Sequence, residues 1–521
     1  MSPPPDMSDA RRQTLALLDA GRPEEALRAA EQLPAEDPNV AQVLAFAEIE
    51  GGEQLADPDI VRRGVGRLAG LEERVGVSMA YNRANGHFAL WMLAVRRDGV
   101  ARAHAEHRID LHAARDAYAT AGGDEDLEEQ MRCQALVNLG NSFDNCGRHA
   151  DALVAYGQAL TIRSGFTMAL GNRGTTLLHR AKQENVHQHA LVSEAVAALD
   201  AALANPDDVL THGGPAVLAS FQAERARIPG TPTHDHDQEP LADPYLEWCR
   251  RRGLFLHPSP RCITRETHVL DRLPLGGMTV KVDERSQQRL KTLRDSLNSL
   301  VQDYLAVRYL AWSVLEPETP LREHAAVVSA HASFYDSLTY ARWGVGTGLR
   351  VAAVAAAMNL LDKTAGVAHQ YLRTGQQPRQ AYFRRFGLLP TKKHQPDRLH
   401  AAFAAELDAG NRGLLALCDL AGELERDTPL NALLVRRHAA THRTVAVHEM
   451  LLDLDDEQSP WLDRVEAGEL GDALLDQLSR ARAALIYLAD AINDPERRTA
   501  PDGPIITLPS WPAEPERPDD W

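Results

Sequence analysis

The chain has few cysteines and few aromatic residues for its 521 positions: five cysteines, and an aromatic content of 5%. The cysteines are far apart and include no Cys-x-x-Cys pair, which argues against a zinc ribbon or a dithiol redox site. They are Cys133, Cys146, Cys249, Cys262 and Cys418. We expect reduced and mostly buried thiols.

Several signatures of enzymes and of exported proteins are missing as well. The sequence has no Gly-x-x-x-x-Gly-Lys-Ser/Thr loop for nucleoside triphosphates, no Gly-x-Ser-x-Gly nucleophile elbow and no His-Glu-x-x-His zinc motif. Residues 1–6 lack the basic and apolar stretches of a secretory signal, and the longest uncharged apolar run, 351–361, is too short to cross a bilayer. We therefore expect a cytoplasmic protein with no membrane segment, no metal centre and no cofactor.

Negative charge is what the chain has in excess. Its formal net charge of −17 argues against nucleic-acid binding by the whole surface. One segment reverses this balance, because residues 363–396 contain seven basic residues, four aromatic residues and no acid. Basic side chains can hold phosphates while aromatic faces accept unstacked bases. The alternative is a solvated loop whose aromatic residues fix it to the core. The candidate RNA-binding residues are Arg373, Arg379, Arg384, Arg385, Lys392 and Lys393.

The first half of the chain repeats a short pattern. Residues 21–27, Gly-Arg-Pro-Glu-Glu-Ala-Leu, return at 147–153 as Gly-Arg-His-Ala-Asp-Ala-Leu. Asn138 and Gly140 return 34 residues later as Asn172 and Gly174, which is the period of tetratricopeptide repeats. Large and small residues around the second copy also follow that repeat. Residues 8–227 therefore resemble a degenerate tetratricopeptide array of paired antiparallel helices.

A repeat array of this kind has a concave groove that can bind peptides or protein segments. Asparagines recur on the first helices of the expected repeats, where a side chain can hydrogen-bond an extended backbone. An equally open interpretation is that they satisfy polar groups between repeats. The candidates are Asn82, Asn85, Asn138, Asn141 and Asn172. We expect a protein or peptide ligand in the groove.

Composition divides the rest of the chain. Residues 228–243 shift to Pro, Gly, Thr, His and Asp, which is typical of a linker, and residues 244–283 form a connector segment. Residues 284–495 are predicted to be a helical domain, followed by a proline-rich tail at 496–521. The predicted helices of this domain are 284–315, 321–343, 345–373, 397–424, 429–451 and 468–492. The predicted fold class is all-α.

Residues 436–443, Arg-Arg-His-Ala-Ala-Thr-His-Arg, interrupt the apolar pattern of the helix predicted at 429–451. That helix has a start signal at 427–429, Asp-Thr-Pro, and an apolar stripe that includes Leu430 and Leu434. Continued at helical spacing, the stripe reaches Arg437, His438 and Thr441 instead of further leucines. Buried charge is costly unless it has a partner or a task, so this segment is the main candidate for a functional site.

Four interpretations of this segment compete. Arg437 could pair with a carboxylate in a polar seam between helices or subunits. His438 and His442, four residues apart on a helix face, could bind a metal ion with His448 or Glu449 as a third ligand. The cationic cluster could bind a nucleotide or a phosphate without catalysis. The fourth interpretation is metal-independent cleavage of RNA.

RNA cleavage by internal transesterification needs a base for the 2′-hydroxyl, charge stabilisation at the phosphorane and an acid for the leaving 5′-oxygen. An imidazole can act as base or acid near neutral pH, and a guanidinium can bind two phosphate oxygens. Arg437 and His442 are separated by about 140° around a helix, so one helix does not aim both at a single phosphate. Two such helices across a two-fold axis would supply both groups to one cleft. This mechanism predicts a homodimer through the C-terminal domain.

The motif from Arg437 to His442, an arginine, a polar residue, three further residues and a histidine, resembles that of the HEPN superfamily, all-helical domains whose active members are ribonucleases. Its late position in an all-α domain after tetratricopeptide-like repeats resembles a bacterial HEPN family associated with anti-phage or abortive-infection systems. Tyr-x-x-Trp-Cys at 245–249, Leu-Phe-Leu at 254–256 and Leu-Asp-Lys at 361–363 are similar to the same family.

The resemblance implies that Arg437 and His442 are catalytic and that His438 and Arg436 are auxiliary. Arg437 rather than Arg436 lies on the apolar stripe, and many family members carry Asn or Asp where this chain has His438. The leading hypothesis is a metal-independent endoribonuclease, a toxin or anti-phage defence effector regulated by a partner-binding repeat array. The alternative is a noncatalytic repeat scaffold with a dimerising helical domain that binds protein or nucleotide.

Overall fold

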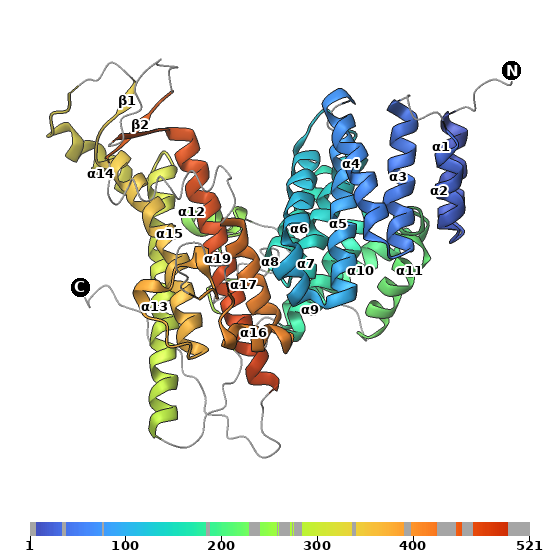
Figure 1. The fold of residues 1–521 in the computed structure, drawn as a ribbon. Helices are drawn as coiled ribbons and strands as arrows, with labels where there is room; N and C mark the ends of the chain where they lie inside the picture. Colours follow the sequence, from blue (N-terminus) through green and yellow to red (C-terminus); the bar gives the residue numbers. More distant parts are fainter. Residues whose placement is uncertain are drawn as a thin grey trace.

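The structure is a computed structural model whose described part is almost entirely helical (Figure 1). It describes residues 7–33, 38–75, 78–183, 188–228, 240–257, 259, 271–273, 275, 284–335, 340–389, 398–424, 444–450 and 462–498. The all-α class predicted from the sequence is confirmed, with one small sheet added to it.

The N-terminal half is a row of antiparallel helices, the repeat array, at the right of Figure 1. The closest packing joins α3 to α4, α5 to α6, α7 to α8 and α9 to α10, and successive pairs pack on one another. The paired helices expected of a tetratricopeptide-like array are therefore present. The helices are α1 (Met7–Asp19), α2 (Pro23–Glu31), α3 (Pro38–Gln54), α4 (Pro58–Val75), α5 (Ser78–Asp98), α6 (Val100–Gly123), α7 (Glu129–Asn145), α8 (His149–Ile162), α9 (Thr167–Gln183), α10 (Gln188–Leu203) and α11 (Pro206–Ala226).

The repeated Gly-Arg pattern marks equivalent turns in the array. Gly21 and Gly147 have φ values of 66° and 76°, in the left-handed region that glycine adopts without a steric cost, and α2 or α8 begins two residues later. Within the second pair, a Cβ at Gly140 would lie 2.3 Å from a ring carbon of Tyr156. The absence of a side chain at position 140 thus lets α7 approach α8 closely.

The C-terminal domain is built around three long helices, α13 (Glu284–Leu315), α15 (Val345–Tyr371) and α19 (Ala467–Arg498), which pack on one another. α15 is long and apolar enough to cross a membrane by composition alone, but its Ala353, Met358 and Leu361 are buried in this core. Its apolar character therefore serves packing. The shorter helices are α12 (Pro244–Arg251), α14 (Pro320–Ala330), α16 (Ala401–Asp408), α17 (Arg412–Leu424), η2 (Pro378–Gln380) and η3 (Phe383–Arg385).

Three short strands form a sheet at the end of this domain far from the repeat array (Figure 1). β1 (Ala341–Arg342) pairs antiparallel with β2 (Thr444–His448), and β2 pairs in parallel with β3 (Leu462–Glu466). Val447 lies opposite Val465, and both side chains are buried against the helical core.

The structure corrects three predicted helices. The helix predicted at 321–343 ends at Ala330, and the one predicted at 397–424 is divided into α16 and α17 by a turn in which Gly410 has a φ of 82°. The helix predicted at 429–451 is wrong at 444–448, where the β-branched Val445 and Val447 favour strand β2. Residues 425–443 lie outside the described residues. The helices predicted at 284–315 and 345–373 are confirmed almost to their ends.

Candidate functional site

The predicted catalytic residues Arg437 and His442, and the auxiliary Arg436 and His438, lie outside the described residues. The described chain resumes at position 444, two positions after His442, with strand β2. The two further ligands of the metal-binding interpretation can be placed. His448 is buried at the end of β2, and Glu449 forms an ion pair of 2.5 Å with Arg342 of β1.

The basic segment 363–396 follows α15 and turns through η2 and η3. Arg373, Arg379 and Arg384 are exposed, Arg385 is half-buried, and Lys392 and Lys393 lie outside the described residues. The exposed guanidinium groups are open to a phosphate backbone, and their role in RNA binding stays a prediction.

Most aromatic residues of this segment face inward. Phe383 and Phe386 are buried, with ring centroids 5.4 Å apart, and Phe386 also meets Phe403 at 5.1 Å. The Tyr371 hydroxyl donates a 3.0 Å hydrogen bond to Glu496 of α19. These three side chains fix the segment to the core, as the alternative interpretation expects. Tyr382, which is 53% exposed, is the one of the four aromatic residues that could stack on a base.

Four of the predicted groove asparagines form hydrogen-bonded pairs along the array. Asn138 Nδ2 donates to Asn85 Oδ1 at 3.2 Å, and Asn172 Nδ2 donates to Asn141 Oδ1 at 2.8 Å. Each accepting amide also receives a tyrosine hydroxyl, from Tyr118 at 2.8 Å and Tyr156 at 2.9 Å respectively. The amides therefore link neighbouring repeats through side chains. Asn82 is half-buried on α5, and a groove-binding role for all five stays a prediction.

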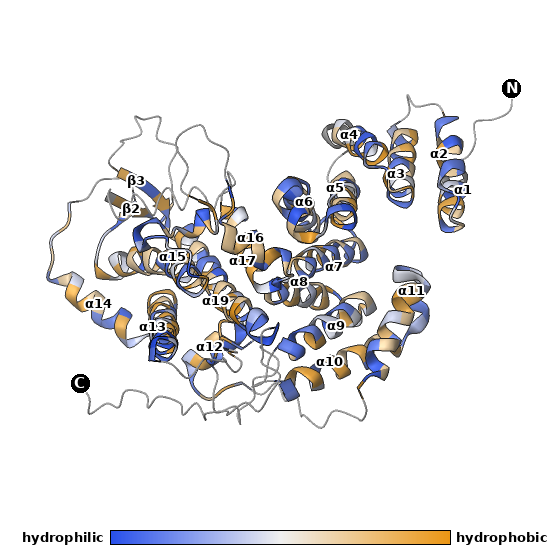
Figure 2. Ribbon diagram, turned by 60° about the horizontal axis from the view of Figure 1, so that its bottom comes forward, coloured by the Kyte–Doolittle hydropathy of each residue, from blue (hydrophilic) through white to orange (hydrophobic). Residues whose placement is uncertain are grey.

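A buried carboxylate that sequence analysis missed joins the two halves of the protein. Asp419 of α17 is fully buried where α17 and α19 lie beside α6 and α8 (Figure 2). Its Oδ2 accepts hydrogen bonds from Arg115 Nη1 at 2.6 Å and from Arg148 Nη1 at 3.1 Å, and its Oδ1 lies 3.0 Å from His104 Nε2. Burial alone would raise the pKa of Asp419, but Arg115 and the other partners hold it well below its usual range. The group is therefore ionised at neutral pH.

Glu423, one helical turn further along α17, extends this interdomain network. Arg148 Nη1 donates to Glu423 Oε1 at 2.5 Å, and Arg480 of α19 donates to its Oε2 at 3.0 Å. Burial would raise the pKa of Glu423, but Arg148, Arg480 and Arg115 outweigh it and lower the pKa to about 2. Two carboxylates of the C-terminal domain thus neutralise two buried arginines of the array.

The turn between α7 and α8 is fixed to the C-terminal domain by further contacts. Arg412 donates to the Asn145 carbonyl at 3.0 Å, and a Cβ at Gly147 would lie 2.7 Å from the Arg412 carbonyl oxygen. The Tyr487 hydroxyl of α19 donates to Asp151 of α8 at 2.7 Å. The array and the C-terminal domain are therefore packed on each other through this turn.

The connector segment is part of the C-terminal core. Arg308 of α13 donates to both carboxylate oxygens of Asp271, at 2.8 and 2.7 Å, and to the Leu254 carbonyl at 2.9 Å. Arg482 of α19 donates to the carbonyls of Phe255 and His257. The Leu-Phe-Leu run at 254–256 is buried, so the residues that carry part of the sequence resemblance are packing residues.

Residues 285–495 match the family model described as LA2681-like HEPN. The C-terminal domain is thus of the LA2681-like HEPN type. The match confirms the resemblance found in the sequence, and it spans the motif at 436–443 as well as α13, α15, α17 and most of α19.

The solved structures that are similar to this chain include two of MamA, and a comparison with curated proteins gives no match. The first, "MamA MSR-1 C2", has 18% sequence identity, covers 37% of this chain and 97% of its own, and gives a TM-score of 0.24. The second, of a MamA mutant, has 18% identity, covers 38% of this chain and 95% of its own, and gives a TM-score of 0.21.

Proposed function

We propose that the protein is a cytoplasmic, metal-independent endoribonuclease of the HEPN type that acts as a toxin or defence effector. In this proposal His442 transfers protons as general acid or base, and Arg437 binds the phosphate and the charge that develops on it. His438 and Arg436 assist. The observation that carries the proposal is the HEPN family match at residues 285–495, a range that contains the Arg437 to His442 motif of the sequence.

Two copies of the HEPN domain would form one active site. The five-residue spacing would place Arg437 and His442 on different sides of the helix that the sequence predicts, so a two-fold axis is the simplest way to bring both to one phosphate. The exposed arginines 373, 379 and 384 would then contact the flanking RNA backbone.

The repeat array would regulate this activity through the interdomain network. Asp419 and Glu423 lie on α17 of the HEPN domain, and their arginine partners Arg115 and Arg148 lie on α6 and at the start of α8. A protein or peptide that shifts these helices would disturb the buried ion pairs that Asp419 and Glu423 form with Arg115 and Arg148. Buried pairs are costly to break, so the coupling would be strong.

The test compares cleavage of RNA by the wild-type protein, Arg437→Ala and His442→Ala. Each variant should lose about 10²-fold or more in cleavage rate while keeping the wild-type unfolding temperature. An RNA with a 2′-deoxy nucleotide at the cleavage site should resist the wild-type protein, because the attacking hydroxyl is missing. Arg436→Ala tests the auxiliary role and should lose less activity than either variant, and Arg28→Ala, at an exposed position of α2, is the control that should cleave at the wild-type rate.

Wild-type cleavage rates in both the Arg437 and His442 variants would overturn the catalytic assignment. The scaffold alternative makes the opposite prediction, with no cleavage by the wild-type protein and loss of partner binding after substitution of Asn82, whose amide no described hydrogen bond engages. Sedimentation of the full chain would show the dimer that the composite site requires.

A further inference from the structure

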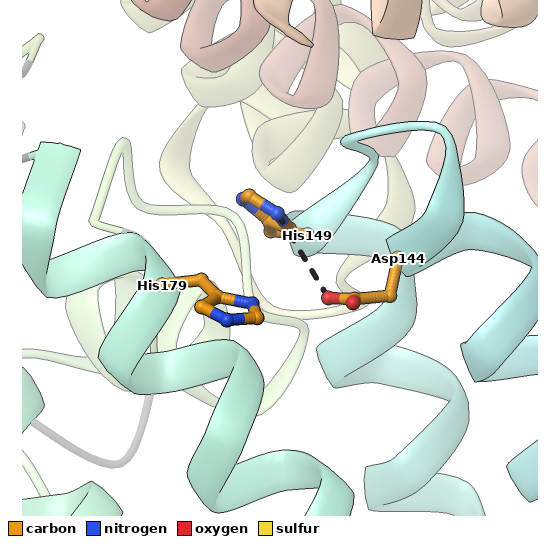
Figure 3. Close-up of side chains that lie close together, drawn as sticks. All are labelled: Asp144, His149 and His179. Atoms are coloured by element: carbon orange, nitrogen blue, oxygen red, sulfur yellow. Dashed lines mark ion pairs between the residues drawn. The ribbon is translucent and has the colours of Figure 1, made fainter. Parts of the chain in front are cut away.

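Three side chains from three helices of the array lie close together next to the turn between α7 and α8. Asp144 ends α7 in its last turn, His149 begins α8, and His179 lies on α9 (Figure 3). One carboxylate oxygen and one nitrogen from each imidazole lie within 4.8 Å of one another. Asp144 Oδ1 and His149 Nε2 are 3.8 Å apart, too far for a direct hydrogen bond. The space between these atoms is of a size that a metal ion can fill.

The state of His149 favours a ligand at this position. Its side chain is 7% exposed, and its Nε2 faces the Asp144 carboxylate. Burial, with smaller contributions from nearby cations and against the effect of Asp144, lowers the pKa of His149 to about 4, so the imidazole is neutral at pH 7. Metal binding requires neutral imidazole and ionised carboxylate.

Asp144 is already oriented by a second contact. The Thr176 hydroxyl of α9 donates a 2.7 Å hydrogen bond to Asp144 Oδ1. Hydrogen bonds of this kind hold metal-bound carboxylates in place and are a regular part of metal sites. The Asp144 side chain is 25% exposed, which gives an ion a path from solvent.

We propose that Asp144, His149 and His179 bind one divalent transition-metal ion of the Zn²⁺ class. Two imidazoles and one carboxylate are ligands that Zn²⁺ accepts, and three protein ligands leave a fourth position for water. The site is independent of the proposed ribonuclease motif. It lies in the repeat array, and its role would be to tie α7, α8 and α9 together beside the turn that contacts the HEPN domain.

Two arginines near the cluster oppose the binding of a cation, and an ion pair neutralises one of them. Arg180, next to His179 on α9, is ion-paired with the buried Asp490 of α19. Arg412 donates to the Asn145 carbonyl and reaches the cluster only as a more distant positive charge. Cys146, between Asp144 and His149 in sequence, packs in a separate apolar cluster with Trp91 and Leu111.

The test is titration of the metal-free full-length protein with Zn²⁺ in a calorimeter. We expect one ion per chain at this site, and His179→Ala and Asp144→Asn should each weaken its affinity by about tenfold or more. His212→Ala is the matched control, because His212 is also half-buried in the array beside a carboxylate, Asp208, but has no second imidazole. It should bind Zn²⁺ as the wild-type protein does.

Zn²⁺ binding by other histidines of the chain must be distinguished from binding at this site. The double variant His438→Ala and His442→Ala should keep the Zn²⁺ affinity of the wild type, whereas loss of binding in it would overturn the proposal. Unchanged binding in both His179→Ala and Asp144→Asn would also overturn it. Circular dichroism of each metal-free variant shows whether it folds. EDTA tests whether RNA cleavage is independent of metal ions, but it would also remove the ion from this site. Its effect on RNA cleavage should therefore be measured in the His179→Ala variant.

Discussion

Asp419 of the HEPN domain accepts a 2.6 Å hydrogen bond from Arg115 of the repeat array, and the two residues are 304 positions apart in the sequence. Arg148 donates to the same oxygen at 3.1 Å. All three side chains are at least 95% buried. The two halves of the chain thus share one ionic network and should unfold together.

Asp419→Asn removes the central charge of this network and leaves Arg115 and Arg148 buried with one carboxylate fewer. Because an uncompensated buried charge is expensive, we expect the free energy of unfolding to fall by about 3–5 kcal/mol. Urea unfolding followed by circular dichroism measures this change. Asp472→Asn, at an exposed position of α19, is the control and should have little effect. Equal stability of the two variants would contradict the proposed importance of the network.

Gly140→Ala should destabilise the array through a single methyl group. The new Cβ would lie 2.3 Å from the buried ring of Tyr156, so α7 and α8 must separate, at a cost of about 1–3 kcal/mol. Gly157→Ala is the matched control on α8, because its Cβ would meet nothing within 4 Å and helix propensity favours alanine. In thermal unfolding, we expect a lower Tm for Gly140→Ala than for the wild type. The Tm of Gly157→Ala should be equal to or above that of the wild type.

Arg308→Lys tests whether the connector is held by the geometry of the guanidinium group. Lysine keeps the charge but cannot bind both oxygens of Asp271 and the Leu254 carbonyl at once, so we expect a loss of about 1.5–3 kcal/mol. Arg322→Lys, on α14, serves as the control for the same substitution. If Arg308→Lys loses no more stability than the control, a positive charge at position 308 is enough to hold the connector.

Stability should fall in acid partly through His369. Burial, followed by the charge of His400, lowers the pKa of His369 from 6.5 to about 4. Between these values the unfolded chain binds a proton that the folded chain does not, so the free energy of unfolding decreases as the pH falls from 6.5 towards 4 and is unaffected by this group above 6.5.

His369→Gln should flatten that part of the stability profile, and His324→Gln, at an exposed position of α14, should not. Urea midpoints measured at several pH values across this window give the two slopes. Other buried histidines add to the wild-type slope, so the comparison that decides is between the two variants. Identical slopes would contradict the prediction.

Arg379→Ala and Arg384→Ala test the basic segment in RNA binding. If each guanidinium contacts one phosphate, each substitution should weaken binding to RNA of any sequence and reduce the slope of log affinity against log salt by about one. Arg28→Ala, exposed on α2 at the opposite end of the molecule (Figure 1), is the control. If the salt dependence of RNA binding is unchanged in both variants, the basic segment serves packing and does not bind RNA.

Patterns that are local in sequence predicted the fold well. The Gly-Arg turns and the 34-residue period predicted the paired helices, and α13 and α15 begin and end close to their predicted bounds. The end of the helix predicted at 429–451 was wrong because the strand at 444–448 is stabilised by pairing with 341–342 and 462–466, which local periodicity does not contain. The division of α16 from α17 depends on a glycine with positive φ that the apolar pattern did not reveal.

The contacts that join distant segments were not predictable from one sequence. Asp419 lies in an apolar helix, where its neighbours Cys418 and Leu420 gave no sign of its partners Arg115 and Arg148. The cluster of Asp144 and His149 with His179 likewise depends on the packing of α9 against α8. The HEPN motif was found because its spacing is local, and its residues lie outside the described part of the chain.

Ala150 of α8, in the repeat array, belongs to the same hydrophobic core as Leu485 and Leu488 of the HEPN domain. A recombinant fragment that begins after the array would therefore lack part of its own core as well as the guanidinium groups that neutralise Asp419 and Glu423. Such a fragment would be prone to aggregate, and a lack of RNA cleavage by it would not test the proposed activity of the intact protein. Dissection of this protein is better done with point substitutions in the full chain than with truncations.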